Sequence, residues 1–127
     1  MNKDVNHVNW FEIPATNISR AKNFYEQVFN VQMEEQEMMG MKMAFFPAEP
    51  GNGKANGGLV QSENHTPSQE GSVVYLNGNP DLQHPLDRVE SAGGKILMPK
   101  TKISDEVGHM AFFEDSEGNR VALHSNN

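Results

Sequence analysis

The chain of 127 residues contains no cysteine and a single tryptophan. Without cysteine it can form no disulfide, hold no metal through thiolates and use no cysteine nucleophile. No apolar run approaches the roughly 20 residues that span a bilayer, and the first ten residues lack the apolar core of a signal peptide. These absences predict a cytoplasmic protein without a membrane partner.

Positive charge is also scarce. The chain has 10 Lys and Arg against 17 Asp and Glu, and its formal net charge is −7. This balance argues against nucleic acid as a partner, because binding a polyanion needs a basic surface. The five histidines include no pair with the spacing of a metal motif such as H-x-H or H-E-x-x-H.

The tetrapeptide MAFF occurs twice, at 43–46 and 110–113, and a Gly-Asn pair follows each copy at the same distance. Both matches give an offset of 67, since 110 − 43 and 118 − 51 are both 67. An amphipathic helix pattern precedes each copy, with Asn17 and Asp81 as the predicted N-caps, although the second helix can also begin at Pro85. An internal duplication explains these coincidences better than chance similarity of two helices.

Each unit is predicted to run in the order β-α-β-β-β. The length suits a single domain, 1–127, with a first module at about 5–62, a polar linker at 63–71 and a second module at about 72–127. We expect a surface loop at 47–58, strands at 7–13, 31–37, 42–47, 57–62, 72–76, 95–99, 107–114 and 120–125, and helices at 18–29 and 82–92.

Two tandem units of this kind, with RAKNFYEQVF at 20–29 and DSEGNRVAL at 115–123, resemble the vicinal oxygen chelate superfamily. That superfamily includes glyoxalase I, bleomycin-resistance proteins and extradiol dioxygenases. The resemblance covers nearly the whole chain. It implies an α+β fold in which two βαβββ modules form a U-shaped mixed sheet around a pocket, with helices on the outer face, usually in a dimer.

The family holds a divalent metal through His and Glu side chains on the first and last strands of each unit. The resemblance places these positions at Trp10, Gly58, Val74 and Ala122, none of which has a metal-binding side chain. We therefore predict no metal and no other cofactor, and we assign these four residues to a ligand-binding pocket. A divalent metal held by relocated ligands remains the alternative.

Strand alternation identifies two titratable candidates. If Phe11 and Ile13 face the helix, Trp10 and Glu12 point into the pocket, and the same rule sends His124 inward on the last strand. Glu12 and His124 are then a candidate catalytic or substrate-orienting pair, with pKa values brought toward neutrality by an apolar pocket. The alternatives are a surface salt bridge for Glu12, a solvated His124, and a core position for Trp10.

The sequence thus predicts a small-molecule-binding protein of the glyoxalase and bleomycin-resistance type that lacks the family metal centre. A metal-dependent glyoxalase- or dioxygenase-type enzyme with relocated ligands is the alternative, and whether the protein is catalytic stays open. The expected partners are an unidentified small molecule and a second copy of the chain. A methionine-rich segment at 33–43 lines an adaptable apolar pocket, forms part of a dimer seam or belongs to the ordinary core.

Overall fold

The computed structural model describes residues 1–127 and contains two four-stranded mixed sheets and two helices. The strand orders, β1-β4-β3-β2 and β5-β8-β7-β6, are the same in both sheets, and the first and last strands of each module pair in parallel. The predicted α+β fold with two tandem βαβββ modules is confirmed. The elements are β1 (Trp10–Pro14), α1 (Ile18–Phe29), β2 (Glu34–Met38), β3 (Met41–Phe45), β4 (Asn56–Gln61), β5 (Tyr75–Asn77), α2 (Gln83–Arg88), β6 (Lys95–Ser104), β7 (Gly108–Glu114) and β8 (Arg120–Ser125).

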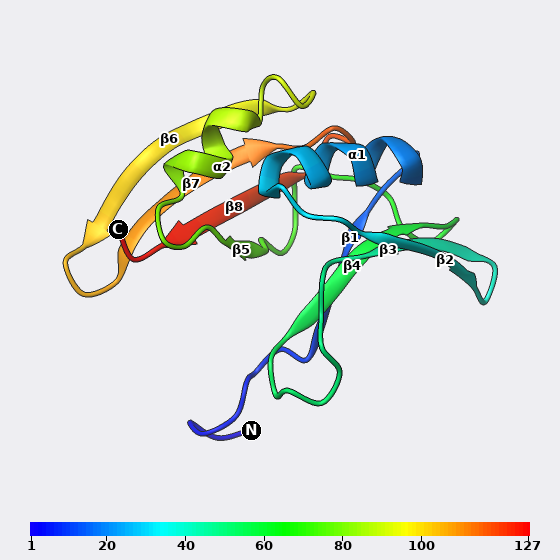
Figure 1. Ribbon diagram of the computed structural model, residues 1–127, viewed down its shortest axis with the longest axis horizontal. Coiled ribbons are helices and arrows are strands. Elements are labelled where there is room, and N and C mark those ends of the chain that lie inside the picture. Colours follow the sequence, from blue (N-terminus) through cyan, green and yellow to red (C-terminus); the bar gives the residue numbers. More distant parts are fainter.

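The two sheets lie on either side of a central junction, with α1 packed over it (Figure 1). They share no hydrogen-bonded strand pair, so the eight strands form two separate sheets. The N-terminal segment projects away from the body of the molecule (Figure 1). Neither helix has the length and apolar character needed to cross a membrane.

Helix α1 begins and ends where its sequence indicates. The Asn17 side chain accepts a hydrogen bond from the backbone N–H of Arg20 at 3.0 Å, which makes Asn17 the predicted N-cap. Asn30 ends the helix in the left-handed conformation, with φ 53°. The buried face of α1 consists of Ile18, Ala21, Phe24, Tyr25 and Val28.

Helix α2 is shorter than predicted and differs at its start. It spans Gln83–Arg88 with Leu82 at the N-cap position, so the prediction that Asp81 is the N-cap was wrong by one residue. Asp81 instead accepts the backbone N–H of Gln83 at 2.9 Å in a local turn. Pro85 lies in the first turn of the helix, where a missing N–H costs no helical hydrogen bond.

One hydrophobic core connects the modules. Eighteen buried residues from both halves form a single cluster, including Phe24 of α1 and Phe113 of β7, whose ring centroids lie 5.9 Å apart. The turn between β7 and β8 adds polar contacts to the first module. The Tyr25 hydroxyl donates to Asp115 at 2.7 Å, and Asn119 donates to the Pro14 carbonyl oxygen at 2.7 Å.

Glu117 in the same turn binds the start of α1. Its Oε1 accepts the backbone N–H groups of Thr16 at 2.9 Å and Asn17 at 2.8 Å, and Arg20 Nε donates to its Oε2 at 2.7 Å. Burial alone would raise its pKa, but the hydrogen bonds from Arg20, Asn17, Ser116 and Thr16 lower the pKa of Glu117 to about 2. We call the turn 115–119 the module latch, because it joins the second sheet to the β1–α1 corner of the first module.

The methionine-rich segment divides between the interior and the surface. Met33 and Met43 are buried, at 5% and 4% exposed, whereas Met38 and Met39 are 44% and 90% exposed. The segment therefore contributes partly to the interior, and the exposed strand β2 with its hairpin tip remains available as an intermolecular surface.

Candidate functional site

The face of each sheet opposite the helices, here called the open face, carries the candidate site. On the first sheet, the strand register puts Glu12, Gly58 and Phe45 side by side. Trp10 lies on the same face and contacts the Phe45 ring edge-on, with centroids 5.7 Å apart. The alternate residue Ile13 is buried in the core. Trp10 and Glu12 therefore lie on the face predicted for them.

The second sheet repeats this arrangement with different residues. Tyr75, Ala122 and Phe112 lie side by side, and the Tyr75 and Phe112 ring centroids are 5.9 Å apart. The guanidinium of Arg120 lies over the Phe112 ring, 5.8 Å from its centroid. Ala122 is fully buried beside these rings.

The register also explains why MAFF recurs. Its first phenylalanine, Phe45 or Phe112, lies on the open face beside the small residue of the last strand. Its second phenylalanine lies on the core side: Phe113 is buried in the core, and Phe46 is partly buried and packs against it. One tetrapeptide therefore supplies a core aromatic and an open-face aromatic in each module.

Val74 does not lie where it was predicted. Tyr75, not Val74, pairs with Ala122, and Val74 packs against the core instead. The error follows from the cap position. Trp10 precedes the N-cap Asn17 by seven residues, and seven residues before the true second N-cap, residue 82, is position 75.

Glu12 is held by two neighbours on the open face. Trp10 Nε1 donates to Glu12 Oε2 at 3.2 Å, and His65 Nε2 lies 2.8 Å from Glu12 Oε1. The hydrogen bond from His65 is the largest cause that lowers the pKa of Glu12, although partial burial opposes it. The predicted rise toward neutrality was wrong for Glu12, because its carboxylate receives donors rather than facing an apolar wall.

His65 is a site residue that sequence reasoning missed. It lies in the polar stretch assigned to a linker, where a turn returns it to the sheet, and its Nδ1 lies 2.6 Å from Ser62 Oγ. A carboxylate only accepts hydrogen bonds, so the imidazole Nε2 carries the proton shared with Glu12. In the neutral imidazole, Nδ1 then accepts from the Ser62 hydroxyl. No spacing in the sequence signals this Ser62–His65–Glu12 chain.

His124 lies on the open face of the second sheet, and its Nε2 is 2.6 Å from the Val107 carbonyl oxygen. No hydrogen bond or ion pair joins it to Glu12, whose polar partners are Trp10 and His65. The pairing of Glu12 with His124 stays a prediction.

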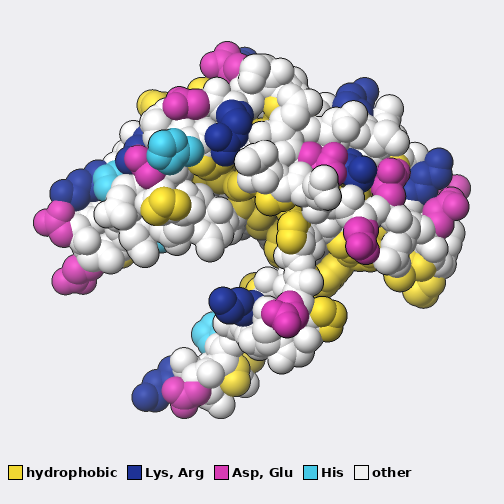
Figure 2. Space-filling model, viewed as in Figure 1, with side chains coloured by type: hydrophobic (Ala, Val, Ile, Leu, Met, Phe, Trp, Pro, Cys, Tyr) yellow, Lys and Arg dark blue, Asp and Glu magenta, His cyan; other side chains and the backbone are white.

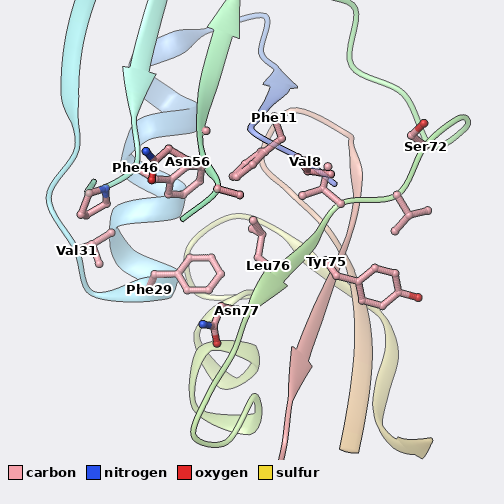
Figure 3. Close-up of a pocket in the computed structure, with 15 residues that line it drawn as sticks. Val8, Phe11, Phe29, Val31, Phe46, Asn56, Ser72, Tyr75, Leu76 and Asn77 are labelled. Atoms are coloured by element: carbon pink, nitrogen blue, oxygen red, sulfur yellow. The ribbon is translucent and has the colours of Figure 1, made fainter. Parts of the chain in front are cut away.

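An apolar cleft opens between the modules on the helix side. Its volume is about 710 Å³, and its walls are mostly hydrophobic. Figure 2 shows hydrophobic side chains gathered in the hollow between the two halves of the molecule. Phe29, Phe46 and Leu76 point into the cleft, whereas Tyr75 points away from it (Figure 3). A smaller polar cavity of about 160 Å³ lies between the sheets and includes Glu12 and Arg120 among its walls.

The profile of the Glyoxalase/Bleomycin resistance protein/Dioxygenase superfamily matches residues 5–123. The chain belongs to this superfamily. A "Glyoxylase-like domain-containing protein" of Didymella fabae is 31% identical over 119 residues, which cover 91% of each chain. A protein named as a glyoxylase in Mycobacterium tuberculosis is 29% identical over 118 residues, covering 91% of this chain but 44% of its own length.

Solved structures show the same superfamily fold. Glyoxalase I from Zea mays superposes with a TM-score of 0.66 at 16% identity, over 93% of this chain and 45% of the maize chain. A glyoxalase/bleomycin resistance protein from Albidiferax ferrireducens gives 0.67 at 12% identity, over 96% of this chain and 100% of that chain. The chain therefore spans less than half the length of its maize and mycobacterial relatives.

The metal positions that the superfamily resemblance implies do not fit a metal here. Gly58 and Ala122 have no donor atoms, and a Cβ added at Gly58 would lie 2.7 Å from the Ala44 carbonyl oxygen and 3.3 Å from the Phe45 ring. No group of three His, Asp or Glu side chains gathers anywhere in the chain. A metal-binding side chain at position 58 would need the neighbouring strand to move.

Proposed function

We propose that this protein binds a small, flat, partly aromatic organic molecule on the open face, without a metal centre. One observation carries this proposal. At the two last-strand positions where the superfamily resemblance implies metal ligands, the chain has small residues flanked by aromatic pairs, Trp10 with Phe45 and Tyr75 with Phe112. Exposed aromatic rings next to a flat floor suit a ligand held by stacking or edge contacts.

Polar groups on this surface would orient the ligand, whereas the aromatic rings alone would bind apolar molecules without a preferred orientation. Glu12 supplies a hydrogen-bond acceptor on the first sheet, and we propose His124 as the polar contact from the second. Val74 lines the small polar cavity together with Glu12 and Arg120, and we propose that it completes the binding surface there. The superfamily names of the relatives do not assign a substrate to this chain, and its site supports binding more directly than any named reaction.

The single tryptophan makes the proposal testable. Titration with 2-phenylethanol is expected to change the emission of Trp10 saturably, and Phe45→Ala to weaken that binding several-fold. Leu97→Ala, which alters an exposed side chain on β6, is the matched control and is expected to bind as wild type. Equal binding by the Phe45→Ala and wild-type proteins would refute the open-face site.

Metal addition tests the second half of the proposal. Zn²⁺, Ni²⁺, Mn²⁺ or Fe²⁺ is expected to leave the thermal midpoint unchanged. A metal that bound only the native state would add about 2.7 kcal/mol at a hundredfold excess over its dissociation constant. Stoichiometric metal retained through chelator dialysis, and lost in Glu12→Gln and His65→Ala, would establish relocated ligands and the metalloenzyme alternative.

We also propose that the protein acts as a cytoplasmic homodimer. The cleft of about 710 Å³ exposes Phe11, Phe29 and Phe46 to solvent in the single chain. A second copy of the chain would bury these rings and offset the cost of leaving a contiguous apolar surface in water. The lack of cysteine is compatible with a reducing compartment.

A further inference from the structure

The open face of the first sheet presents one carboxylate next to two aromatic rings. Trp10 is 43% exposed, so part of its indole remains open to solvent, and Phe45 supports it edge-on at 5.7 Å. Glu12 lies on the same strand and receives the indole N–H at 3.2 Å. This arrangement attracts positive charge in two ways. The faces of the aromatic rings attract a cation through their quadrupole, and the carboxylate attracts it through its negative charge.

Two hydrogen bonds hold the Glu12 carboxylate in place, but its oxygens can accept more. A carboxylate has about four lone-pair sites, of which His65 and Trp10 use one on each oxygen. The side chain is 33% exposed, so a ligand can reach the remaining sites. The same two hydrogen bonds keep its pKa low, and the group is therefore ionised at neutral pH.

No lysine or arginine neutralises this charge. The one ion-pair partner of Glu12 within 4.0 Å is His65, which carries charge only when protonated. Across Phe45, the residue directly opposite on β2 is Glu34, another acid. Arg120 lies over Phe112 on the other sheet and forms no ion pair, although it lines the small polar cavity with Glu12. The first sheet is therefore the negative side of the site.

We infer that the ligand carries a cationic nitrogen, as a primary or quaternary ammonium attached to an aromatic or apolar body. This inference rests on the proposed binding of a flat molecule to the open face. The ammonium group occupies the free lone-pair sites of Glu12 and approaches the exposed indole of Trp10, while the body of the ligand lies against Phe45 over Gly58. Both contacts discriminate against neutral and anionic molecules of the same shape.

Three matched probes separate the ligand class from the binding function: phenethylammonium, 2-phenylethanol and phenylacetate. Each is titrated at pH 7.5 and low salt, with the emission of Trp10 as the signal. Phenethylammonium is expected to bind about tenfold more tightly than 2-phenylethanol, with phenylacetate weakest, as charge-assisted contacts predict. The tenfold preference is expected to shrink at high salt, because the site is partly exposed.

The substitution Glu12→Gln removes the charge and keeps the shape of the side chain. Its amide oxygen still accepts the indole N–H, and its NH2 group donates to His65 Nε2 once the imidazole proton moves to Nδ1. The substitution is expected to remove the preference for the cation, so that the affinity ratio of phenethylammonium to 2-phenylethanol falls from about ten to about one. Glu90→Gln removes one exposed acid whose side chain makes no hydrogen bond or ion pair, and it is expected to retain the preference. If Glu12→Gln does not fold, as judged by thermal unfolding, the salt dependence of the wild-type preference decides.

The outcomes are distinct. Equal or tighter binding of 2-phenylethanol or phenylacetate would overturn the cationic ligand class while leaving the proposed binding function standing. Equal or tighter binding of phenylacetate would also point to Arg120 as the dominant charge. No saturable change with any of the three probes would overturn the proposed function and this inference together.

Discussion

Replacing Glu117 by glutamine measures how strongly the module latch holds the two halves together. The Glu117 side chain is fully buried, and its carboxylate binds two backbone N–H groups and Arg20 at the start of α1. A pKa lowered from 4.5 to about 2 corresponds to a ceiling of roughly 3 kcal/mol, at about 1.4 kcal/mol per pKa unit. The Arg20 side chain is 54% exposed, so solvent screening reduces the expected loss to about 2 kcal/mol.

The contribution of Glu117 to the free energy of unfolding should decrease as the pH falls. Because the folded-state pKa lies below the unfolded value, the contribution is fully present above about pH 5 and is lost as pH falls from 4.5 toward 2. Burial raises the pKa of Asp115 in the same latch, which acts in the opposite direction. The contribution of Asp115 cancels in the difference in unfolding free energy between wild type and Glu117→Gln. This difference is expected to shrink by more than half between pH 6 and pH 3.

Urea unfolding at both pH values is the assay, with Glu90→Gln as the control for loss of one negative charge. Equal urea midpoints for Glu117→Gln and Glu90→Gln at pH 6 would refute the stabilising role of the Glu117 carboxylate. The same stability difference between Glu117→Gln and wild type at pH 6 and at pH 3 would also refute it, because the carboxylate charge would then contribute nothing to stability.

Four further predictions rest on single contacts or surfaces. Tyr25→Phe removes a donor from buried Asp115 and should cost about 1–2 kcal/mol in urea unfolding, whereas unchanged stability would deny that hydrogen bond a role. Gly58→Ala places a Cβ 2.7 Å from a backbone carbonyl oxygen and should cost about 1–3 kcal/mol; a thermal midpoint equal to wild type contradicts this. His65→Ala should raise the pKa of Glu12 toward 4.5, as followed by a carboxyl NMR titration, and an unchanged titration would remove His65 as the cause. Sedimentation at micromolar concentration should give twice the chain mass, and a species of 14.2 kDa alone would count against the homodimer.

Strand faces were predictable because alternation is a local property. Phe11 and Ile13 identified the core side of β1, and the open-face positions of Trp10 and Glu12 followed from the period of two. The same rule placed Ala122 correctly on β8. The repeat predicted the shared strand order of the two sheets, because each copy contained the same succession of patterns.

Positions that depend on a turn were not predictable in the same way. Val74 was placed by counting from Asp81, and a cap displaced by one residue reversed the face of the whole strand. His65 reaches Glu12 because the chain turns back toward the sheet directly after β4. The two residues are 53 positions apart in the sequence. A polar, turn-rich stretch indicates that a bend exists but not which side chain it returns to the sheet.

The module latch also breaks the symmetry of the duplication. In the second copy the Gly-Asn pair includes Asn119, which is 5% exposed and donates to the Pro14 carbonyl oxygen of the other module. The corresponding Asn52 is exposed and accepts a hydrogen bond only from its neighbour Lys54. An affinity tag or a longer natural insertion can therefore be accommodated at 47–55 at little cost to the fold. The same insertion at 115–119 would separate the modules, so related chains should vary in length at the first turn and keep the second one fixed.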